Sequence, residues 1–151
     1  MKFSVVMASR LENYPSAGRG RDGKLLRAVN SVVNQSFQDW ELHVVADGCQ
    51  KTIDIVQMNV HDRRVHLWKV THKKLWSGTP RNRGIDQSVG EYIIYLDNDD
   101  VYGPDHLSKV NAELSGDWVW FNDIRYNVHI RQWYENNCDI DKLGRHGTSN
   151  L

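Results

Sequence analysis

Three carboxylates stand close together in the segment 97–100, Asp-Asn-Asp-Asp, directly after the apolar and aromatic run at 92–96. Carboxylates held at the dry end of a buried strand repel each other, so they either raise each other's pKa or bind a cation. Their oxygens suit hard divalent ions, and Mg²⁺ typically takes one or two protein carboxylates beside water and phosphate oxygens. Asp97 and Asp99 are therefore candidate metal ligands. The segment is equally rich in turn and helix-cap formers, which leaves a plain turn as the alternative.

Two further polar groups stand beside predicted elements. Asp47 and Gly48 follow the apolar run at 41–46. Asp47 could accept a hydrogen bond from a base N–H or a ribose hydroxyl, although a simple turn explains this dipeptide better when it is taken alone. Arg81 and Arg83 stand at the start of a predicted helix, where a guanidinium beside helix N–H groups suits a diphosphate. A solvated helix face explains the two arginines equally well.

Strands and helices alternate four times along the chain, which predicts the element order that must position these groups. Apolar runs predict strands at 3–8, 41–46 and 92–96, and alternating polar and apolar residues predict a further strand at 64–70. Apolar residues at helical spacing, together with Pro near two starts, predict helices at 24–35, 52–59, 80–88 and 104–114. This alternation is typical of an α/β fold with a mostly parallel sheet flanked by helices, and ligands bind such sheets beyond the carboxyl ends of the strands.

The remainder of the chain is predicted to be less regular. Two further strands are predicted at 117–121 and 125–130, and the sequence after Trp133 is polar, which predicts irregular structure. No internal repeat or linker interrupts the chain, so a single domain over residues 1–151 is expected.

The composition excludes several classes of function. Lys and Arg (19) balance Asp and Glu (19), which gives no electrostatic reason to expect nucleic acid or an anionic membrane as a partner. Cys49 and Cys138 form neither a metal-ligand spacing nor a disulfide framework. No segment approaches the roughly 18 apolar residues of a transmembrane helix. A soluble, cytoplasmic protein is therefore expected, and the sequence leaves open whether it forms a homodimer.

Three segments in order resemble the family 2 glycosyltransferases with the GT-A fold. Residues 31–48 look like that family's helix, Gln-Ser-aromatic turn, strand and Asp-Gly segment. Residues 78–100 look like its Arg-Asn-x-Gly helix and the strand that carries an Asp-x-Asp motif, and residues 101–114 continue the match. The similarity covers about residues 3–122, and the order and spacing of several motifs make it far more specific than Asp-x-Asp alone.

The resemblance implies a glycosyltransferase that depends on Mn²⁺ or Mg²⁺, uses a UDP-sugar donor of the glucose or galactose type, and inverts the anomeric centre. Carried over by position, Asp47 would contact the uracil, Asp97 would face the ribose or the metal, and Asp99 would bind the metal that bridges the diphosphate. The full set of positions that would contact the nucleotide-sugar is Ala8, Ser9, Arg10, Asp47, Arg81, Asp97 and Asn98. His146, in the tail, is a candidate third metal ligand.

Two features depart from the family pattern. Ala46 stands where the family usually has the first of two Asp residues. Inverting members also use an Asp or Glu as base, in a segment that would begin about where this chain stops at Leu151. Asp123 and Asp141 are the candidate bases within the chain. A non-catalytic or partner-dependent nucleotide-sugar binding module therefore stays open as the alternative, and a nucleotidyltransferase is a third class that shares the broad sheet architecture.

Overall fold

The computed structural model describes residues 1–12, 19–72, 77–114, 116, 123–127 and 132–136. The chain divides into two compact units, residues 1–108 and residues 109–151, and each is treated by itself. A single domain over residues 1–151 stays a prediction.

The first unit contains a four-stranded parallel sheet in the order β3-β2-β1-β4. Its strands are β1 (Phe3–Ser9), β2 (Trp40–Asp47), β3 (Val65–Val70) and β4 (Tyr92–Tyr95). The helices that follow these strands are α1 (Arg21–Val33), α2 (Gln50–Asn59), α3 (Gly78–Gln87) and α4 (His106–Glu113). All eight predicted elements are present, and the predicted parallel α/β sheet flanked by helices is confirmed. The boundaries differ slightly; α1, for example, begins at Arg21 rather than at Lys24.

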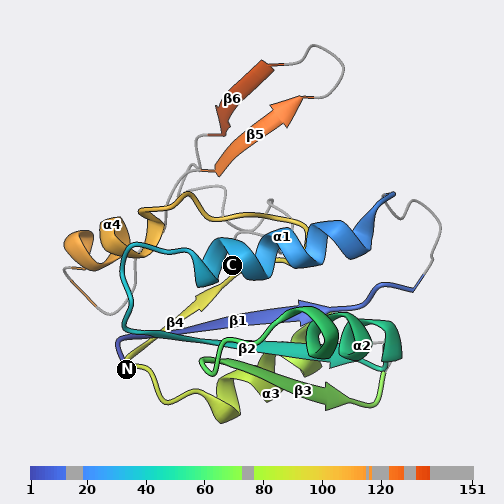
Figure 1. Cartoon of the computed structure of the whole chain (residues 1–151). Helices are drawn as coiled ribbons and strands as arrows, with labels where there is room; N and C mark the ends of the chain where they lie inside the picture. Colours follow the sequence, from blue (N-terminus) through green and yellow to red (C-terminus); the bar gives the residue numbers. More distant parts are fainter. Residues whose placement is uncertain (13–18, 73–76, 115, 117–122, 128–131, 137–151) are drawn as a thin grey trace. The chain divides into compact units, whose positions relative to one another are not determined.

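The strand order reverses direction once, and this places helices on both faces of the sheet. From β1 the chain moves outward to β2 and β3, and it then returns to add β4 on the other side of β1. Because parallel crossovers are right-handed, α1 and α2 lie on one face and α3 lies on the other. The first two helices contact each other, while α3 packs against β1, β2 and β3. Figure 1 shows the four strands side by side, from β4 through β1 and β2 to β3.

The core forms where both faces of the central strands are covered. Every residue of β2 is buried, and only Ala8 of β1 is partly accessible. Alternate side chains of β1 point to opposite faces, so that Val6 faces α3 while Val5 and Met7 face the other side. The helix α1 adds the buried residues Leu25, Ala28, Val29 and Val32. This burial explains why β1 reads as an almost continuous apolar run rather than as an alternating pattern.

Gly84 lets α3 approach β1 closely, and this contact gives a stability prediction. A Cβ added at Gly84 would lie 2.5 Å from Cγ1 of Val6, which is too close for any real side chain. Gly84→Ala should therefore destabilise the fold by about 1 to 3 kcal/mol through overpacking. The matched control is Gly23→Ala in α1, where an added Cβ meets nothing within 4 Å. Urea unfolding should show the control unchanged or stabilised by about 0.5 to 1 kcal/mol, because alanine favours helix. Equal midpoints for the two variants would contradict the close packing.

A buried polar cluster lies on the α3 face of the sheet, at the amino end of the strands. Oε1 of Glu41 accepts hydrogen bonds from Oγ of Ser4 at 2.6 Å and from the backbone N–H of Val89 at 2.8 Å. Nε2 of His43 lies 3.1 Å from the same oxygen, and the indole N–H of Trp68 donates to Nδ1 of His43. These contacts fasten the connection between α3 and β4 onto the two central strands.

The described part of the second unit is an antiparallel pair formed by β5 (Asp123–Asn127) and β6 (Gln132–Asn136). A strand was expected at 125–130, and β5 overlaps it. Irregular structure was expected after Trp133. This expectation is wrong for residues 134–136, because β6 extends to Asn136. Gln132 and Glu135 of β6 are exposed, so a polar sequence can form this strand without an apolar run. The predicted strand at 117–121 lies outside the described residues.

None of the helices in the described ranges has the length and apolar character required to cross a membrane.

Candidate functional site

The carboxyl ends of β1, β2 and β4 deliver polar side chains to one edge of the sheet. A chain of hydrogen bonds shows that the ends of β1 and β4 meet there. Nδ2 of Asn98 donates to Oγ of Ser9 at 3.0 Å, and this hydroxyl lies 3.0 Å from Oγ1 of Thr52 at the start of α2. Ser9 is only 1% exposed, so its hydroxyl serves as a tie between elements. Contact of Ser9, Asn98 and the half-buried Ala8 with a ligand stays a prediction.

The acidic segment after β4 forms a turn in which Asp97 and Asp99 have different surroundings. The backbone N–H of Asp100 donates to the carbonyl of Asp97 at 3.1 Å, which closes a β-turn. Oδ1 of Asp97 accepts a hydrogen bond from Nη2 of Arg81 at 2.8 Å. Asp99 is exposed, and no side chain within the described ranges forms a hydrogen bond or an ion pair with it. The turn therefore carries one carboxylate that is paired, on Asp97, and one that is unengaged among the described residues, on Asp99.

This pair of carboxylates suits a hard divalent cation. Two carboxylates are the usual protein share of a Mg²⁺ site that is completed by water and phosphate oxygens. Asp97 shares one oxygen with Arg81, and Asp99 keeps both of its oxygens available. The described residues contain no group of three or more metal-binding side chains, and His146 lies outside them. The donor set of Asp97 and Asp99 therefore fits Mg²⁺ or Mn²⁺, while a third protein ligand stays a prediction.

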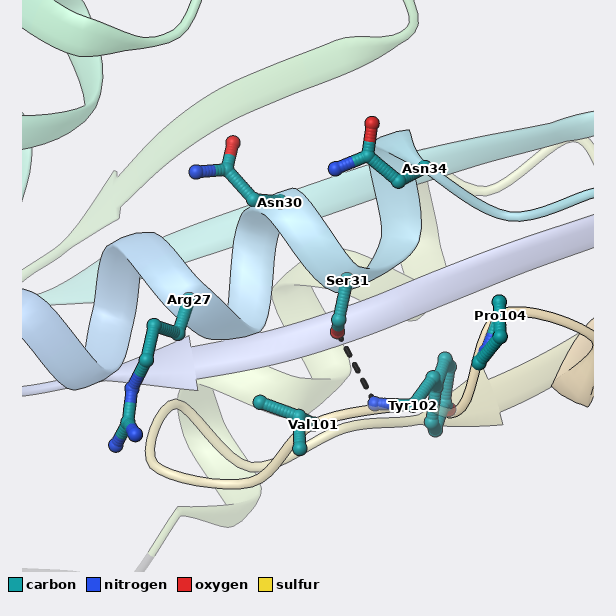
Figure 2. Close-up of a pocket in the computed structure, with 7 residues that line it drawn as sticks. All are labelled: Arg27, Asn30, Ser31, Asn34, Val101, Tyr102 and Pro104. Atoms are coloured by element: carbon teal, nitrogen blue, oxygen red, sulfur yellow. Dashed lines mark hydrogen bonds between the residues drawn. The ribbon is translucent and has the colours of Figure 1, made fainter.

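The turn is held in place by the segment that follows it. Figure 2 shows residues 101–104 running beside α1, where Oγ of Ser31 accepts a hydrogen bond from the backbone N–H of Tyr102 at 3.1 Å. The hydroxyl of Tyr102 donates to the carbonyl of Tyr95 at 2.9 Å. Burial raises the pKa of this hydroxyl, and the nearby charges of Asp97 and Asp100 raise it further, so it stays a donor. These contacts fix the exit from the turn.

An open groove of about 350 Å³ borders this segment, lined by Arg27, Asn30, Ser31, Asn34, Val101, Tyr102 and Pro104 (Figure 2). Arg27 and Ser31 point toward the segment, whereas Asn30 and Asn34 point away from it. The groove therefore lacks a convergent set of polar groups.

Asp47, at the end of β2, has one engaged carboxylate oxygen and one unengaged oxygen. Oδ2 lies 2.9 Å from Nδ1 of His72, whereas Oδ1 is buried and has no hydrogen-bond partner among the described residues. The residue as a whole is 7% exposed. A buried carboxylate oxygen without a partner is costly, so this atom is suited to accept a hydrogen bond from a ligand.

His72 is a site residue that the sequence predictions missed. It stands two residues after the end of β3, at the same sheet edge as Asp47. A Cβ added at Gly48 would lie 2.6 Å from Cβ of His72, and Gly48 has a positive φ of 62°. Both observations explain why glycine follows Asp47. A polar residue just beyond a third parallel strand was the available signal, because the ends of parallel strands share one edge.

Arg10 completes this side of the site. One of its guanidinium nitrogens contacts the ring nitrogens of His72. The other two lie 3.2 and 2.6 Å from Oε2 of Glu12. The hydrogen bonds and charge of Arg10 hold the pKa of Glu12 below its ordinary value. Arg10 was predicted to contact a nucleotide-sugar, and the structure places it behind His72 at the edge where Asp47 lies.

The two predicted base candidates have no described side-chain position. Asp123 is the first residue of β5 in the second unit, and Asp141 lies outside the described residues. Both stay predictions.

Comparison with protein families and curated proteins gives a consistent result. The family model for glycosyl transferase family 2 matches residues 19–144. A glycosyltransferase from Haemophilus influenzae, described as uncharacterized, is 36% identical over 87 residues, which cover 56% of this chain and 34% of that protein. The uncharacterized glycosyltransferase MJ1057 from Methanocaldococcus jannaschii is 29% identical over 136 residues, covering 83% of this chain and 44% of the relative. The chain thus spans between a third and a half of the length of these relatives.

Comparison with solved structures supports the fold. The structure of residues 1–349 of TarS from S. aureus in complex with UDP superposes with a TM-score of 0.62 and 24% sequence identity. The match covers 74% of this chain and 31% of the TarS chain. At this identity the likeness establishes a shared fold.

Proposed function

The chain belongs to glycosyl transferase family 2, and on this premise we propose that it transfers a sugar from a UDP-sugar donor to an acceptor hydroxyl with the help of Mn²⁺ or Mg²⁺. The observation that carries the proposal is the family match over residues 19–144, because that range contains Asp47, Arg81, Asp97 and Asp99. The proposed donor sugar is of the glucose or galactose type. The UDP complex of a protein with the same fold supports UDP as the nucleotide.

The sheet edge offers separate groups for the two ends of a nucleoside diphosphate. At one end, the buried and unpartnered Oδ1 of Asp47 is suited to accept a hydrogen bond from the imide N–H of uracil. At the other, the guanidinium of Arg81 stands beside the acidic turn, 2.8 Å from Asp97. A guanidinium can bind diphosphate oxygens while it also keeps a neighbouring carboxylate in position.

Asp97 and Asp99 are the residues proposed to hold the divalent cation. Their oxygens lie on one turn, and Asp99 is not engaged by any described side chain. A bound Mg²⁺ or Mn²⁺ would offset the negative charge that develops on the departing diphosphate. Arg81 and Asp97 form an ion pair beside the position proposed for the diphosphate. When the donor and the cation bind, both side chains therefore still have an opposite charge nearby.

The transfer itself needs a group that accepts the proton of the acceptor. In the proposed inverting reaction, the acceptor oxygen forms a bond to the anomeric carbon as the bond between that carbon and the diphosphate oxygen breaks. The acceptor proton then passes to a carboxylate within about 3 Å, either directly or through one water. Asp123 and Asp141 are the proposed candidates for this base.

Turnover of a donor panel tests the proposal. The chain is incubated with Mn²⁺ and, separately, UDP-glucose, UDP-galactose, UDP-N-acetylglucosamine and GDP-mannose, and the released nucleotide is followed with simple saccharides as acceptors. Release of UDP from at least one UDP-sugar, lost on addition of EDTA, is the expected result. UDP binding without any turnover would favour a binding module instead. Release of pyrophosphate from UTP and a sugar phosphate would indicate a nucleotidyltransferase.

A further inference from the structure

We propose that His72 is a positioning residue for the carboxylate of Asp47 and that Arg10 holds the imidazole in place, so that the pair selects uracil over cytosine in the donor nucleotide. The inference rests on the proposed function for the identity of the ligand. It goes beyond it because it assigns base selection to two residues that need not touch the base.

The contact with Asp47 determines which nitrogen of His72 carries the proton. Nδ1 lies 2.9 Å from Oδ2 of Asp47. An ionised carboxylate can only accept hydrogen bonds, so in a neutral imidazole Nδ1 carries the hydrogen and donates it to Asp47. One guanidinium nitrogen of Arg10 contacts both ring nitrogens, so Arg10 lies against the imidazole and holds it in place without choosing its tautomer.

Neighbouring residues restrict the movement of Arg10 and His72. Arg10 is held from its other side by Glu12, at 2.6 Å between Nη2 and Oε2. His72 packs against the backbone of Gly48. A Cβ added at Gly48 would lie 2.6 Å from Cβ of His72. The backbone N–H of Gly48 donates to the carbonyl of Val70 at 2.9 Å, which ties the end of β2 to the end of β3. The imidazole therefore occupies a defined position beside Asp47.

The fixed carboxylate has a consequence for the base. With Oδ2 occupied by His72, only Oδ1 of Asp47 is left to meet a ligand, and it is buried and acceptor-only. Uracil presents an N–H at ring position 3, whereas cytosine presents a lone pair there. A buried acceptor facing a lone pair is left unsatisfied, and this costs far more than a missing apolar contact. Without His72 the carboxylate could turn and lose this discrimination.

Calorimetry with UDP and CDP, each with Mn²⁺, tests the inference on three proteins. The wild type should bind UDP at least about tenfold more tightly than CDP, the amount expected for one hydrogen bond to a charged group. His72→Leu removes the donor at similar volume and should lower UDP affinity about tenfold while changing CDP affinity little. His72→Asn should recover most of the UDP preference, because its Nδ2 stands where Nδ1 of the imidazole stands.

The ring nitrogens give a second readout that needs no nucleotide. In ¹⁵N NMR spectra of the free protein, His72 should show the tautomer protonated at Nδ1. Arg10→Met should keep this tautomer, because Asp47 still accepts from Nδ1, but it should lower the preference for UDP over CDP in calorimetry, because the imidazole loses the side chain that holds it. Thermal unfolding of each variant serves as the control for folding.

The outcomes separate this inference from the proposed function. Absence of UDP binding by the wild type would overturn both. UDP binding with an unchanged preference in His72→Leu, or failure of His72→Asn to restore the preference, would overturn the inference alone. A His72 protonated at Nε2 in the free protein would overturn it whatever the nucleotide result, and an unchanged preference for UDP in Arg10→Met would overturn the part assigned to Arg10.

Discussion

Replacing Asp99 with alanine should remove metal-dependent UDP binding and leave the fold intact. The side chain is exposed in a turn beyond the end of β4, and its loss removes no hydrogen bond or ion pair to any side chain that the structure describes. Loss of a residue that merely supports a metal ligand already costs about 10- to 100-fold in affinity, so loss of a ligand should cost at least about 100-fold. Titration of Mn²⁺ and UDP by calorimetry, with thermal unfolding alongside, measures both effects.

A matched control separates a specific metal ligand from a simple change of charge. Asp86 is an exposed Asp on α3, so Asp86→Ala changes the net charge by the same amount. This control should bind UDP and Mn²⁺ like the wild type. If Asp99→Ala kept the wild-type dependence of UDP affinity on Mn²⁺, the assignment of Asp99 would be wrong. If both variants lost affinity equally, long-range charge rather than ligation would explain the result.

The fold was predictable because its signals are local and its topology is constrained. Three strands of the parallel sheet were predicted from short apolar runs and β3 from an alternating pattern. Each helix follows with apolar residues at helical spacing, and right-handed crossovers leave few arrangements. The edge position of Asp47 and Asp97 followed from the same rule, since the carboxyl ends of parallel strands lie together. The strand β6 was missed because its exposed polar residues carry no apolar pattern.

The connections among the site residues were not predictable, because they join segments that are far apart in the sequence. His72 lies 25 residues after Asp47 and 62 residues after Arg10. Each of the three belongs to a different strand end or loop, and no spacing in the sequence indicates that they touch. The role of Asn98 illustrates the same limit. Its residue type suggested a ligand contact, while its Nδ2 reaches back 89 residues to Ser9 and ties β4 to β1.

The polar cluster around Glu41 shows why the structural role of a buried charged residue is not evident from the sequence. Glu41 stands at the start of a predicted strand, where a charge usually marks a boundary. Its partners Ser4 and Val89 lie 37 and 48 residues away, so only the folded sheet brings them together. Glu41 is nonetheless 4% exposed, and the cluster it centres lies opposite the candidate site, at the amino end of the strands.

Glu41→Ala should destabilise the protein by about 3 kcal/mol, because it strips partners from several buried groups at once. The hydroxyl of Ser4 and the N–H of Val89 would lose their acceptor, and Nε2 of His43 would lose the carboxylate that lies 3.1 Å away. The matched control is Glu91→Ala. Glu91 is an exposed carboxylate that pairs with Lys2 at 3.0 Å, and surface pairs contribute about 0 to 1 kcal/mol. Urea unfolding at pH 7 measures both variants.

The same carboxylate makes the effect depend on pH in a defined direction. Burial works to raise the pKa of Glu41, but the hydrogen bonds from Ser4 and Val89 and the neighbouring His43 outweigh it, so that the pKa lies below its usual value of 4.5. The folded state therefore favours the charged form, and its contribution is complete above the unfolded pKa and is lost as pH falls through the folded pKa. The stability gap between the wild type and Glu41→Ala should accordingly narrow below about pH 4.5. A gap that stayed constant or widened with acid would mean that the hydrogen bonds do not favour the carboxylate over the protonated acid.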